Sequence, residues 1–534
     1  MDTLEKPKSL MPPTPPKVVM PVQTAPSQHS PRARRFRVNA FHFSGNTVYP
    51  KQVLKRVLER YMDLELNLYD LNKAAEALTV FYHDHGYMLA RAVIPPQKVV
   101  DGVVKIQIVE GRIGKTTFKG NHRYSDRFIA ARTRSLTTGA LVTTNNLETN
   151  LLLLNDLPGL SAKVLLEPGS EFGDTDAEID LTEKLFSASV GVNNHGRSET
   201  GKNRIDLSAS LNSPFGWGDQ LTVGGSRTSA GLTRLGSVNY SIPVNTLGTR
   251  LSVGASKVTY DVDASKKADL GISGEVSSTN ITVTHPLVRT RDETEIISVS
   301  IKKDQLKQND ELASIKSDHS INVINFSYLA NTINADTSVT NARFSLTTNF
   351  KRVDDNITPY TVVDRTEYTQ QNAVLARWEM DVNHNTPFSG SWDLYVRANL
   401  MYSSQMLPDT EKFSIGGPSS VRGYRPSELR GDSGYLATME LRRPFSLAGR
   451  YGIFRLTADS GEVTAKASGY GKNGAPFRDS SDRLHSAGFG ATFYPTQNMV
   501  ASFDVAQPIG KTTLNDGTEV PRSTKFWISV SANF

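Results

Sequence analysis

In the C-terminal two thirds of the chain, apolar and polar residues alternate in segments of about ten residues, separated by turns rich in Gly, Pro, Asn and Ser. In 391–402, Val396 and Leu400 fall on one side of an extended chain, and Arg397 and Asn399 fall on the other. Segments of this length and period are typical of tilted strands that cross a bilayer. We predict sixteen such strands, at 185–193, 204–211, 219–226, 235–242, 248–257, 274–284, 293–302, 320–329, 338–347, 370–380, 391–402, 434–443, 452–460, 485–493, 498–506 and 525–534.

The connections between these strands fall into two classes. Counted from the first strand, the even connections are short, as in SPFGWG and YPTQ, whereas the odd connections are longer and the longest runs from 403 to 433. Outer-membrane barrels have short turns at one rim and long loops at the other, and a water-soluble sandwich has no reason to sort its loops. The sequence therefore predicts a mainly β fold, with a sixteen-stranded antiparallel transmembrane β-barrel at 185–534 and a long sixth loop at 403–433.

Residues 36–184 contain an α/β pattern that occurs twice. Each copy reads strand, helix, helix, strand, strand, and we place the copies at 36–111 and 112–184. The turn FSGN at 43–46 recurs as FKGN at 118–121. Gly-Asn suits a turn position with positive φ, so the two copies are expected to share this turn. The pattern predicts two small α/β domains in front of the barrel.

The first 35 residues are rich in proline and predict a semi-rigid spacer rather than a folded domain. Residues 2–11 allow at most a short helix, which Pro7 weakens. No apolar leader follows Met1, so for an exported protein we expect a processed or altered start.

Composition narrows the class of protein. Hydrophobic residues make up 38% of the chain, and no stretch approaches the roughly 18 apolar residues of a spanning helix. The net charge of +6 is mild for this length and does not call for a nucleic-acid partner. Cysteine is absent, which excludes disulfides, thiolate metal sites and cysteine nucleophiles and suits a chain that crosses an oxidising compartment.

The sequence has little enzymatic or metal-binding chemistry. The run His83-Asp84-His85 suggests a metal site, but helical residues two apart do not share a face, so we interpret these histidines as surface residues. No GxSxG or GxxxxGK[ST] motif occurs. We therefore expect no enzymatic activity, no cofactor and no metal.

The sixth loop carries a compact cluster, Val421-Arg422-Gly423-Tyr424, within SIGGPSSVRGYRPSELRGDSGY. We hypothesise that the loop folds back into the lumen and that Arg422 pairs with Asp459, because the planar guanidinium matches a carboxylate. Gly423 would let the backbone approach the wall, and Tyr424 would pack within the loop. The alternative is a solvated arginine in a surface loop.

The predicted position of Asp459 on its strand supports this pairing. Asp459 shares one side of the thirteenth strand with Arg455 and Thr457, opposite the apolar Leu456 and Ala458. In a barrel the apolar side faces lipid, so Asp459 is expected to face the lumen.

The second α/β copy, with LLNDLPGLSAKVLLEPGSEFGDTDAEIDL, resembles the second POTRA domain of the two-partner secretion outer-membrane transporters (TpsB, the FhaC/ShlB/HecB family of the Omp85 superfamily). That family's plan is two POTRA domains, a sixteen-stranded barrel, VRGY in the sixth loop and the motif Phe/Gly-x-Asp-x-Gly on strand thirteen. Here that motif contains Asp459 and Gly461, but Thr457 departs at its first position. The family often has an N-terminal plug helix, which residues 2–11 match poorly.

The resemblance implies POTRA 1 at 36–111, POTRA 2 of the ShlB type at 112–184, and a translocase of the Gram-negative outer membrane for two-partner (type Vb) secretion. Its POTRA domains, in the periplasm, would capture an unfolded exoprotein that then passes through the barrel. The alternative is an Omp85-type insertase of barrel proteins. A passive porin would lack the POTRA domains, and a soluble adhesin-like protein would lack the sorted loops.

The expected partners are a large secreted TpsA exoprotein of the adhesin, haemolysin or toxin type, outer-membrane lipid, the barrel assembly machinery and periplasmic chaperones. We expect a monomer with no nucleic-acid partner. The chain ends in FWISVSANF, in which Phe526, Ile528, Val530 and Phe534 share the lipid face. Phe526 and Phe534 resemble the signal that the assembly machinery reads.

Overall fold

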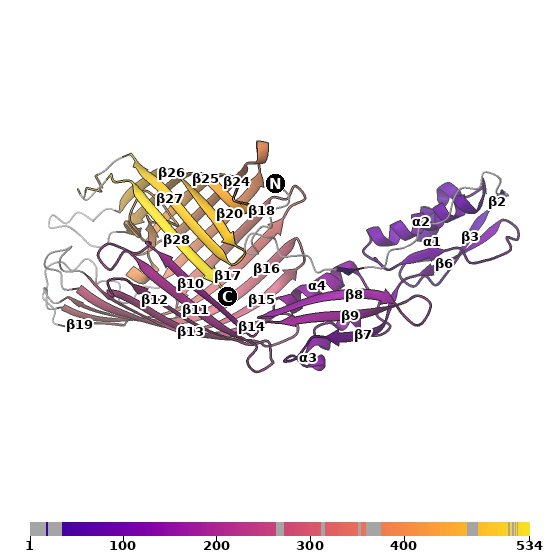
Figure 1. The fold of residues 1–534 in the computed structure, drawn as a ribbon, viewed down its shortest axis with the longest axis horizontal. Helices are drawn as coiled ribbons and strands as arrows, with labels where there is room; N and C mark the ends of the chain where they lie inside the picture. Colours follow the sequence, from indigo (N-terminus) through magenta and orange to yellow (C-terminus); the bar gives the residue numbers. More distant parts are fainter. Residues whose placement is uncertain are drawn as a thin grey trace. The chain divides into compact units, whose positions relative to one another are not determined.

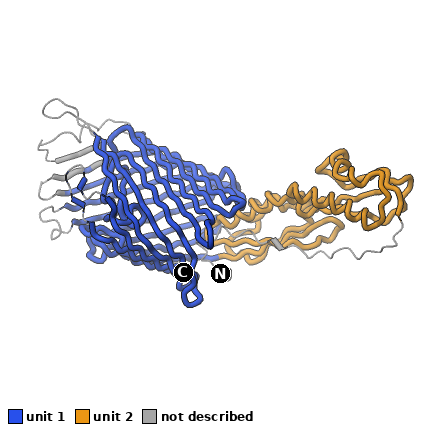
Figure 2. The backbone as a smooth tube through the Cα atoms, turned by 90° about the horizontal axis from the view of Figure 1, so that it is seen from above, with its two compact units in different colours: residues 1–12, 184–534 blue, residues 13–183 orange. Residues whose placement is uncertain are grey.

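The structure is a computed structural model that describes residues 18–19, 35–262, 272–310, 315–350, 354–358, 375–466, 479–510, 513–514, 517, 519–520 and 522–534. The chain divides into two compact units (Figure 2). One unit contains the barrel, from Lys184 to Phe534, and the other contains the described residues up to Glu183. None of the described helices has the length and apolar character needed to cross a bilayer.

Sixteen antiparallel strands form a closed barrel in sequence order, and the last strand pairs with the first (Figure 1). The predicted fold class is confirmed, and each of the sixteen predicted strands is present. The strands are β10 (Phe186–Asn193), β11 (Arg204–Asn212), β12 (Gln220–Thr228), β13 (Thr233–Pro243), β14 (Arg250–Asp261), β15 (Ile272–Arg289), β16 (Glu293–Asp310), β17 (Ile315–Ile333), β18 (Val339–Asn349), β20 (Ala376–Pro387), β21 (Asp393–Ser403), β24 (Ser433–Leu447), β25 (Arg450–Ala465), β26 (Ser480–Thr496), β27 (Met499–Ile509) and β28 (Lys525–Asn533).

Side chains alternate between the outside of the barrel and its lumen. On β28, Phe526 and Ile528 are about half exposed, as apolar side chains that face lipid must be, while Trp527 between them is only 4% exposed. On β11, Ile205 and Leu207 face outward in the same way. The period of two that predicted the strands therefore corresponds to an apolar outer face and a polar inner face.

Several strands are longer than predicted. The alternation that marked the seventh strand ends near residue 302, but β16 continues to Asp310. Both faces of this extension carry polar residues, so its pattern resembles a loop even though its backbone pairs with β15 and β17. The tenth strand begins at Ala376 rather than at 370, and residues 370–374 lie outside the described part of the chain. A short strand, β19 (Asp354–Thr358), pairs with β17 within a predicted loop.

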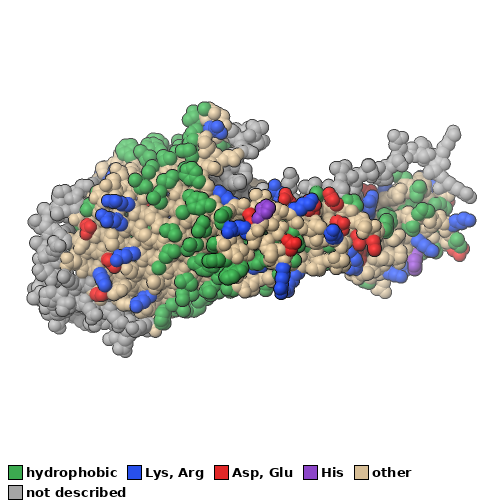
Figure 3. Space-filling view, turned by 60° about the horizontal axis from the view of Figure 1, so that its bottom comes forward, with side chains coloured by type: hydrophobic (Ala, Val, Ile, Leu, Met, Phe, Trp, Pro, Cys, Tyr) green, Lys and Arg blue, Asp and Glu red, His purple; other side chains and the backbone are tan. Residues whose placement is uncertain are grey.

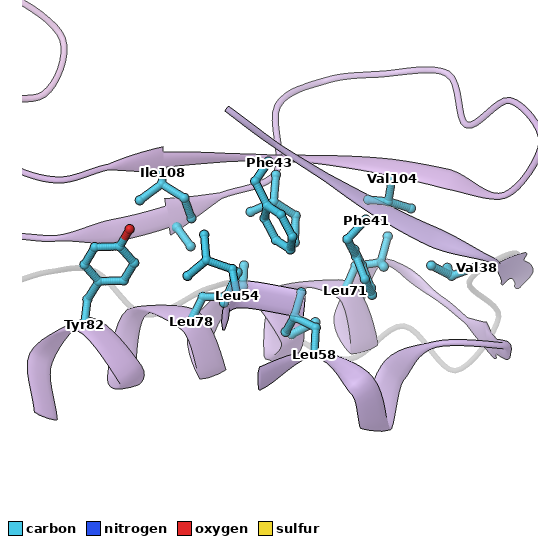
Figure 4. Packing of buried hydrophobic residues seen from close by; sticks show 14 of the residues in the cluster. Val38, Phe41, Phe43, Leu54, Leu58, Leu71, Leu78, Tyr82, Val104 and Ile108 are labelled. Carbon is cyan, nitrogen blue, oxygen red and sulfur yellow. The ribbon is translucent and has the colours of Figure 1, made fainter. Parts of the chain in front are cut away.

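The first α/β fold in the other unit has one continuous apolar core. A sheet of order β3-β6-β5 lies against two helices, and Leu54, Leu58 and Leu78 from the helices point toward Phe43 and Ile108 on the strands (Figure 4). Its elements are β2 (Phe36–Val38), β3 (Ala40–Ser44), α1 (Lys51–Val57), η1 (Glu59–Tyr61), β4 (Leu64–Leu66), α2 (Leu68–Asp84), β5 (Arg91–Val93) and β6 (Val103–Val109). The strand predicted from 36 is divided into β2 and β3, and β2 pairs with β4.

The second α/β fold has its own core of buried leucine, isoleucine and valine side chains. Its elements are β7 (Arg112–Lys119), α3 (Asp126–Ala130), η2 (Arg134–Leu136), α4 (Thr144–Asn155), β8 (Leu160–Pro168) and β9 (Asp174–Glu183). β9 lies between β8 and β7 in the sheet. The order of elements follows the predicted pattern in the second copy, whereas in the first copy the additional strand β4 lies between the two helices.

The repeated Gly-Asn turn has the same geometry in both copies. Gly45 and Gly120 each have φ +79°, as the turn was predicted to require. A Cβ on Gly45 would lie 2.2 Å from the carbonyl oxygen of Ile108, and a Cβ on Gly120 would lie 2.1 Å from that of Leu181. Any other residue would therefore push the turn away from the last strand of its own fold.

A carboxylate at the end of each last strand holds the residues after this turn. Glu110 accepts hydrogen bonds from the backbone N–H groups of Thr47 (2.7 Å) and Val48 (2.8 Å) and from the hydroxyl of Tyr82 (3.1 Å). Glu183 accepts backbone N–H groups of the second turn in the same way. Burial raises the pKa of Glu110, but these hydrogen bonds outweigh it and hold the pKa below its ordinary value.

The proline-rich segment contributes one short strand that the sequence did not predict. β1 (Val18–Val19) pairs in parallel with Val164 and Leu165 of β8, so the interpretation of 1–35 as a spacer alone is wrong at these residues. Edge strands present unpaired backbone groups that accept any extended segment, regardless of its propensity. The possible plug helix at 2–11 lies outside the described residues.

Candidate functional site

The sixth loop packs against inward-facing side chains of the barrel wall. Within it, β22 (Phe413–Ile415) and β23 (Leu429–Gly431) form a small hairpin, and the predicted motif lies between these two strands. The turn is closed by a hydrogen bond from the N–H of Tyr424 to the carbonyl of Val421 (3.2 Å). All four motif residues are buried.

Arg422 lies between two carboxylates of neighbouring strands. Its guanidinium donates to Glu440 on β24 and lies 3.5 Å from the Oδ1 atom of Asp459 on β25. Its backbone N–H also donates to the Oδ2 atom of Asp459 (3.2 Å). The structure therefore brings the predicted pair together and adds Glu440, which sequence reasoning missed and which is the closer of the two carboxylates.

Each carboxylate has further partners that hold it in place. Asp459 accepts hydrogen bonds from the hydroxyls of Thr438 and Ser486, both at 3.1 Å. Glu440 accepts from the Nε atom of Arg442 at 2.7 Å. Because Asp459 has four donors around it, it is the fixed point of the network, whereas Glu440 is shared between two arginines.

Two glycines allow the loop to lie directly on the wall. A Cβ on Gly423 would lie 2.8 Å from the Cβ of Ser486 and 2.9 Å from the backbone nitrogen of Pro508. A Cβ on Gly461 would lie 3.2 Å from side-chain atoms of Ile415 and Val421 in the loop. The Asp-x-Gly part of the strand-thirteen motif therefore combines a charge partner with space for the loop.

Apolar contacts surround the charged centre. Val421 and Tyr424 belong to a buried cluster with Ile415 and Leu429 of the loop and with residues of the wall, among them Val463 on β25. Tyr424 was expected to pack only within the loop, and this part of the prediction is wrong. Thr457, where the sequence departs from the family motif, is buried directly opposite Glu440 on β24.

The loop also contacts the last strand and the first long loop. The indole N–H of Trp527 on β28 donates to the backbone carbonyl of Arg422 at 2.8 Å. Arg425 forms an ion pair with Glu199 of the first long loop (3.0 Å). Trp527 could have been found from the sequence, because its position between two lipid-facing residues places its ring in the lumen.

The start of the sixth loop is anchored on other strands of the wall, β16 and β20. Glu411, 2% exposed, pairs with Lys302 on β16 (2.9 Å) and with Arg377 on β20 (2.8 Å). Nothing in the sequence distinguishes Glu411 from a solvated loop residue. The loop is therefore held by buried charges near its start, at Glu411, and at its tip, at Arg422.

The remaining predicted residues lie outside this centre. Phe526 and Phe534 are exposed on the outer face of β28, where no side-chain partner fixes a role for them. His83 and His85 each hydrogen-bond a backbone carbonyl. In the part of the chain that the structure describes, no cluster of three or more His, Cys, Asp or Glu side chains could hold a metal ion.

A closed sixteen-stranded barrel with a long loop docked against its inner wall, preceded by two α/β folds, has the architecture of an outer-membrane transporter. Comparison with known proteins identifies the family. The family model of the haemolysin secretion/activation protein ShlB/FhaC/HecB matches residues 174–493, and the model of the ShlB-type POTRA domain matches residues 36–111.

Individual relatives and a solved structure are also similar to this chain. The heme/hemopexin transporter protein HuxB of Haemophilus influenzae (strain 86-028NP) is 25% identical over 495 residues, which cover 90% of this chain and 84% of HuxB. The outer membrane transporter CdiB of Dickeya dadantii (strain 3937) is 22% identical over 407 residues, 75% of this chain and 71% of CdiB. The structure of CdiB from Escherichia coli has a TM-score of 0.71 at 19% identity, covers 96% of this chain and 93% of that one, and shows the same fold.

The chain belongs to the ShlB/FhaC/HecB family of haemolysin secretion/activation proteins. It is an outer-membrane translocase of two-partner secretion, its POTRA region is periplasmic, and transporters of this type work with TpsA exoproteins. Members of the family are transporters and not enzymes. The predicted family, function and location are confirmed, and the ShlB-type POTRA model matches the first α/β fold.

Proposed function

We propose that the docked sixth loop is the structural element that keeps this translocase competent for secretion. The observation that carries the proposal is the buried position of Arg422 between Glu440 and Asp459, with its backbone carbonyl bound by Trp527. Three side chains from three strands, Glu440, Asp459 and Trp527, converge on one loop residue, which fixes the loop tip on the wall between β24 and β28. Variants that undock the loop should insert into the membrane and yet secrete poorly.

We also propose that the chain has two POTRA domains, at 36–111 and 112–184, in front of a barrel at 185–534, and that they capture the unfolded exoprotein as an added strand. The support is β1, which shows that the edge of β8 accepts an extended segment with only main-chain pairing. An exoprotein that replaces β1 on this edge would need little side-chain specificity.

A photo-crosslinking amino acid at Lys163 on β8 tests this edge. A second one at Lys115 on β7, at the other edge of the same sheet, is the matched control. We expect the exoprotein to be trapped from Lys163 and not from Lys115 during secretion. Crosslinks from Lys115 alone would place the cargo on the other edge and contradict the proposal.

The exoprotein itself is proposed from the relatives. HuxB is a heme/hemopexin transporter, which favours a cargo for haem or haemopexin uptake over the adhesin, haemolysin or toxin types that the sequence left open. Co-expression with exoproteins of each class, followed by detection in the medium, tests this assignment. The match to a secretion/activation family disfavours the alternative role as an insertase.

The other partners are part of the same proposal. The exposed apolar face of β28 supports contact with outer-membrane lipid and recognition of Phe526 and Phe534 by the barrel assembly machinery, after delivery by periplasmic chaperones. We infer that the transporter acts as a monomer, since one barrel already contains the complete loop-docking site. We also propose that it acts without nucleic acid, cofactor, metal or enzymatic activity.

A further inference from the structure

The outward face of β12–β16 changes from apolar to mainly basic toward the long loops. One row of directly paired residues is wholly apolar and runs Leu221, Tyr240, Val253, Ile281 and Ile301 across five strands. Six residues further along each strand, the paired row reads Arg227, Arg234, Thr259, Glu275 and Lys307. Between these rows, Lys257 and Lys303 also face outward and are exposed.

Figure 3 shows a band of apolar side chains across the visible face of the barrel, with Lys and Arg side chains and fewer Asp and Glu side chains on one side of it. Carboxylates compensate only part of this charge. Lys257 pairs with Glu275 (2.8 Å), and Asp318 is bound by the side-chain amide of Gln305 (3.2 Å). Among the described residues, no carboxylate lies within ion-pair distance of the other four cations, Arg227, Arg234, Lys303 and Lys307.

A groove lies in the wall beside these cations. It has a volume of about 610 Å³ and is lined by apolar side chains that include Tyr240, Val253 and Ile301, with Lys303 at its edge. The small side chains of Ala255 and Thr279 form its recessed part. An apolar recess with a cation at its edge fits an acyl chain joined to an anionic headgroup.

Open space also lies among the cations themselves. Gly236 occupies the outward position between Arg234 and Val238, and a Cβ on Gly236 would meet no atom within 4 Å. The neighbouring residue on the next strand is Lys257. A bulky headgroup could therefore lie against the wall here and still reach both cations.

We propose that this surface, made of the groove and the cations Arg234, Lys257 and Lys303, binds a phosphorylated glycolipid of the outer leaflet, of the lipid A type. An acyl chain fills the groove, and the phosphates lie against the cations. The long loops are at the external rim of the transporter, so the basic rows lie at the level of the outer-leaflet headgroups. Phosphates on a sugar match the unneutralised charge of Arg234 and Lys303 and the open space, whereas a neutral lipid would leave these two cations without an anionic partner.

The test uses the full-length protein in an uncharged detergent. Native mass spectrometry measures the binding of lipid A, of dephosphorylated lipid A with the same acyl chains, and of phosphatidylglycerol. We expect lipid A to bind at least tenfold more tightly than either other lipid. Each cation near a lipid surface contributes about a fivefold change in affinity, so Arg234→Gln, Lys257→Gln and Lys303→Gln together should weaken lipid A binding about 100-fold.

Three further variants test the specificity of the site. Lys303→Gln alone should weaken binding about fivefold, whereas Arg483→Gln, which removes an exposed cation from β26, should leave it unchanged. Thr279→Trp fills the groove and should weaken all three lipids equally. Heat-dependent gel mobility shows that each variant has folded. Equal affinity for the dephosphorylated lipid or for phosphatidylglycerol, a triple variant that keeps its preference, or unchanged binding in Thr279→Trp would overturn the proposal.

Discussion

Replacing Arg422 by alanine removes one guanidinium from a site that contains two buried carboxylates. The side chains of Arg422, Glu440 and Asp459 are 9%, 6% and 0% exposed. After the substitution, Arg442 alone remains beside Glu440, and Asp459 keeps only its hydroxyl partners and the backbone N–H. Leaving a buried charge without its partner costs about 3–5 kcal/mol, which corresponds to a shift of about 10² to 10³·⁵ in the docking equilibrium.

Two measurements follow the loop and its function separately. Protease added outside intact cells reports whether the sixth loop is accessible, and the amount of exoprotein in the medium, divided by the amount of folded barrel, reports secretion. We expect Arg422→Ala, Asp459→Ala and Glu440→Ala each to expose the loop and lower secretion while insertion continues. Arg422→Lys should rescue poorly, because one ammonium group cannot span both carboxylates as the planar guanidinium does.

The control and the double variants decide whether these groups act together. Arg425→Ala removes an arginine of the same loop whose partners, Glu199 and Glu428, both lie in loops and not on the barrel wall, so it should affect docking to the wall less than Arg422→Ala does. The double variant Arg422→Ala/Asp459→Ala should be little worse than either single one, because both remove the same interaction. If the single defects simply add, or if external protease digests the loop in the unchanged protein, the docked pair does not exist.

Four further outcomes are expected. Trp527→Phe leaves the buried carbonyl of Arg422 without its donor, and should cost about 1–3 kcal/mol of docking, seen as faster loop proteolysis; normal proteolysis would contradict this. Phe534→Ser should lower the amount of inserted barrel but not the secretion per inserted molecule, and the opposite result would refute its role in assembly. Deletion of 36–184 should leave insertion intact and abolish secretion; normal secretion would remove these residues from cargo capture. Glu110→Gln should destabilise residues 36–183 to urea by about 1–3 kcal/mol at neutral pH. Because the folded-state pKa of Glu110 is depressed, this difference is present above the unfolded pKa and vanishes as pH falls through the folded one, so a pH-independent difference would contradict it.

The barrel was predictable because its lipid-facing residues carry a strict period of two. The predicted strands end where contact with lipid ends, because beyond the bilayer neither face of a strand must be apolar. The extension of β16 to Asp310 was missed for this reason. The α/β folds were predictable from helical spacing and the repeated Gly-Asn turn. β1 was not, because its pairing depends on the open edge of β8 and not on any preference of Val18 or Val19.

Part of the loop-docking site could be predicted from the same alternation of residues along the strands. The alternation of inward and outward residues along each strand places Asp459 in the lumen, and it places Glu440 and Trp527 there as well. The alternation does not predict how far along the barrel axis each side chain lies. Only the register of β24 against β25 shows that Glu440 lies two residue pairs from the Thr438–Asp459 pair, on the same face of the wall. Glu411 lies in a loop, where no period exists, and its pairing with Lys302 required the folded structure.

The chemistry of the docking site suits a loop that must be held in one place without being held permanently. Bringing Arg422, Glu440 and Asp459 out of water costs about as much as their attraction returns, so the intact network adds little net stability, whereas the loss of one member is severe. The apolar cluster around Val421 and Tyr424 stabilises contact with the wall, but apolar packing alone tolerates many positions. The charged centre of Arg422, Glu440 and Asp459 is satisfied in only one position of the loop. When the loop undocks, water can solvate all three charged groups again. Specific docking with a low net free energy is what a translocation pore requires if its lumen must be both closed and opened.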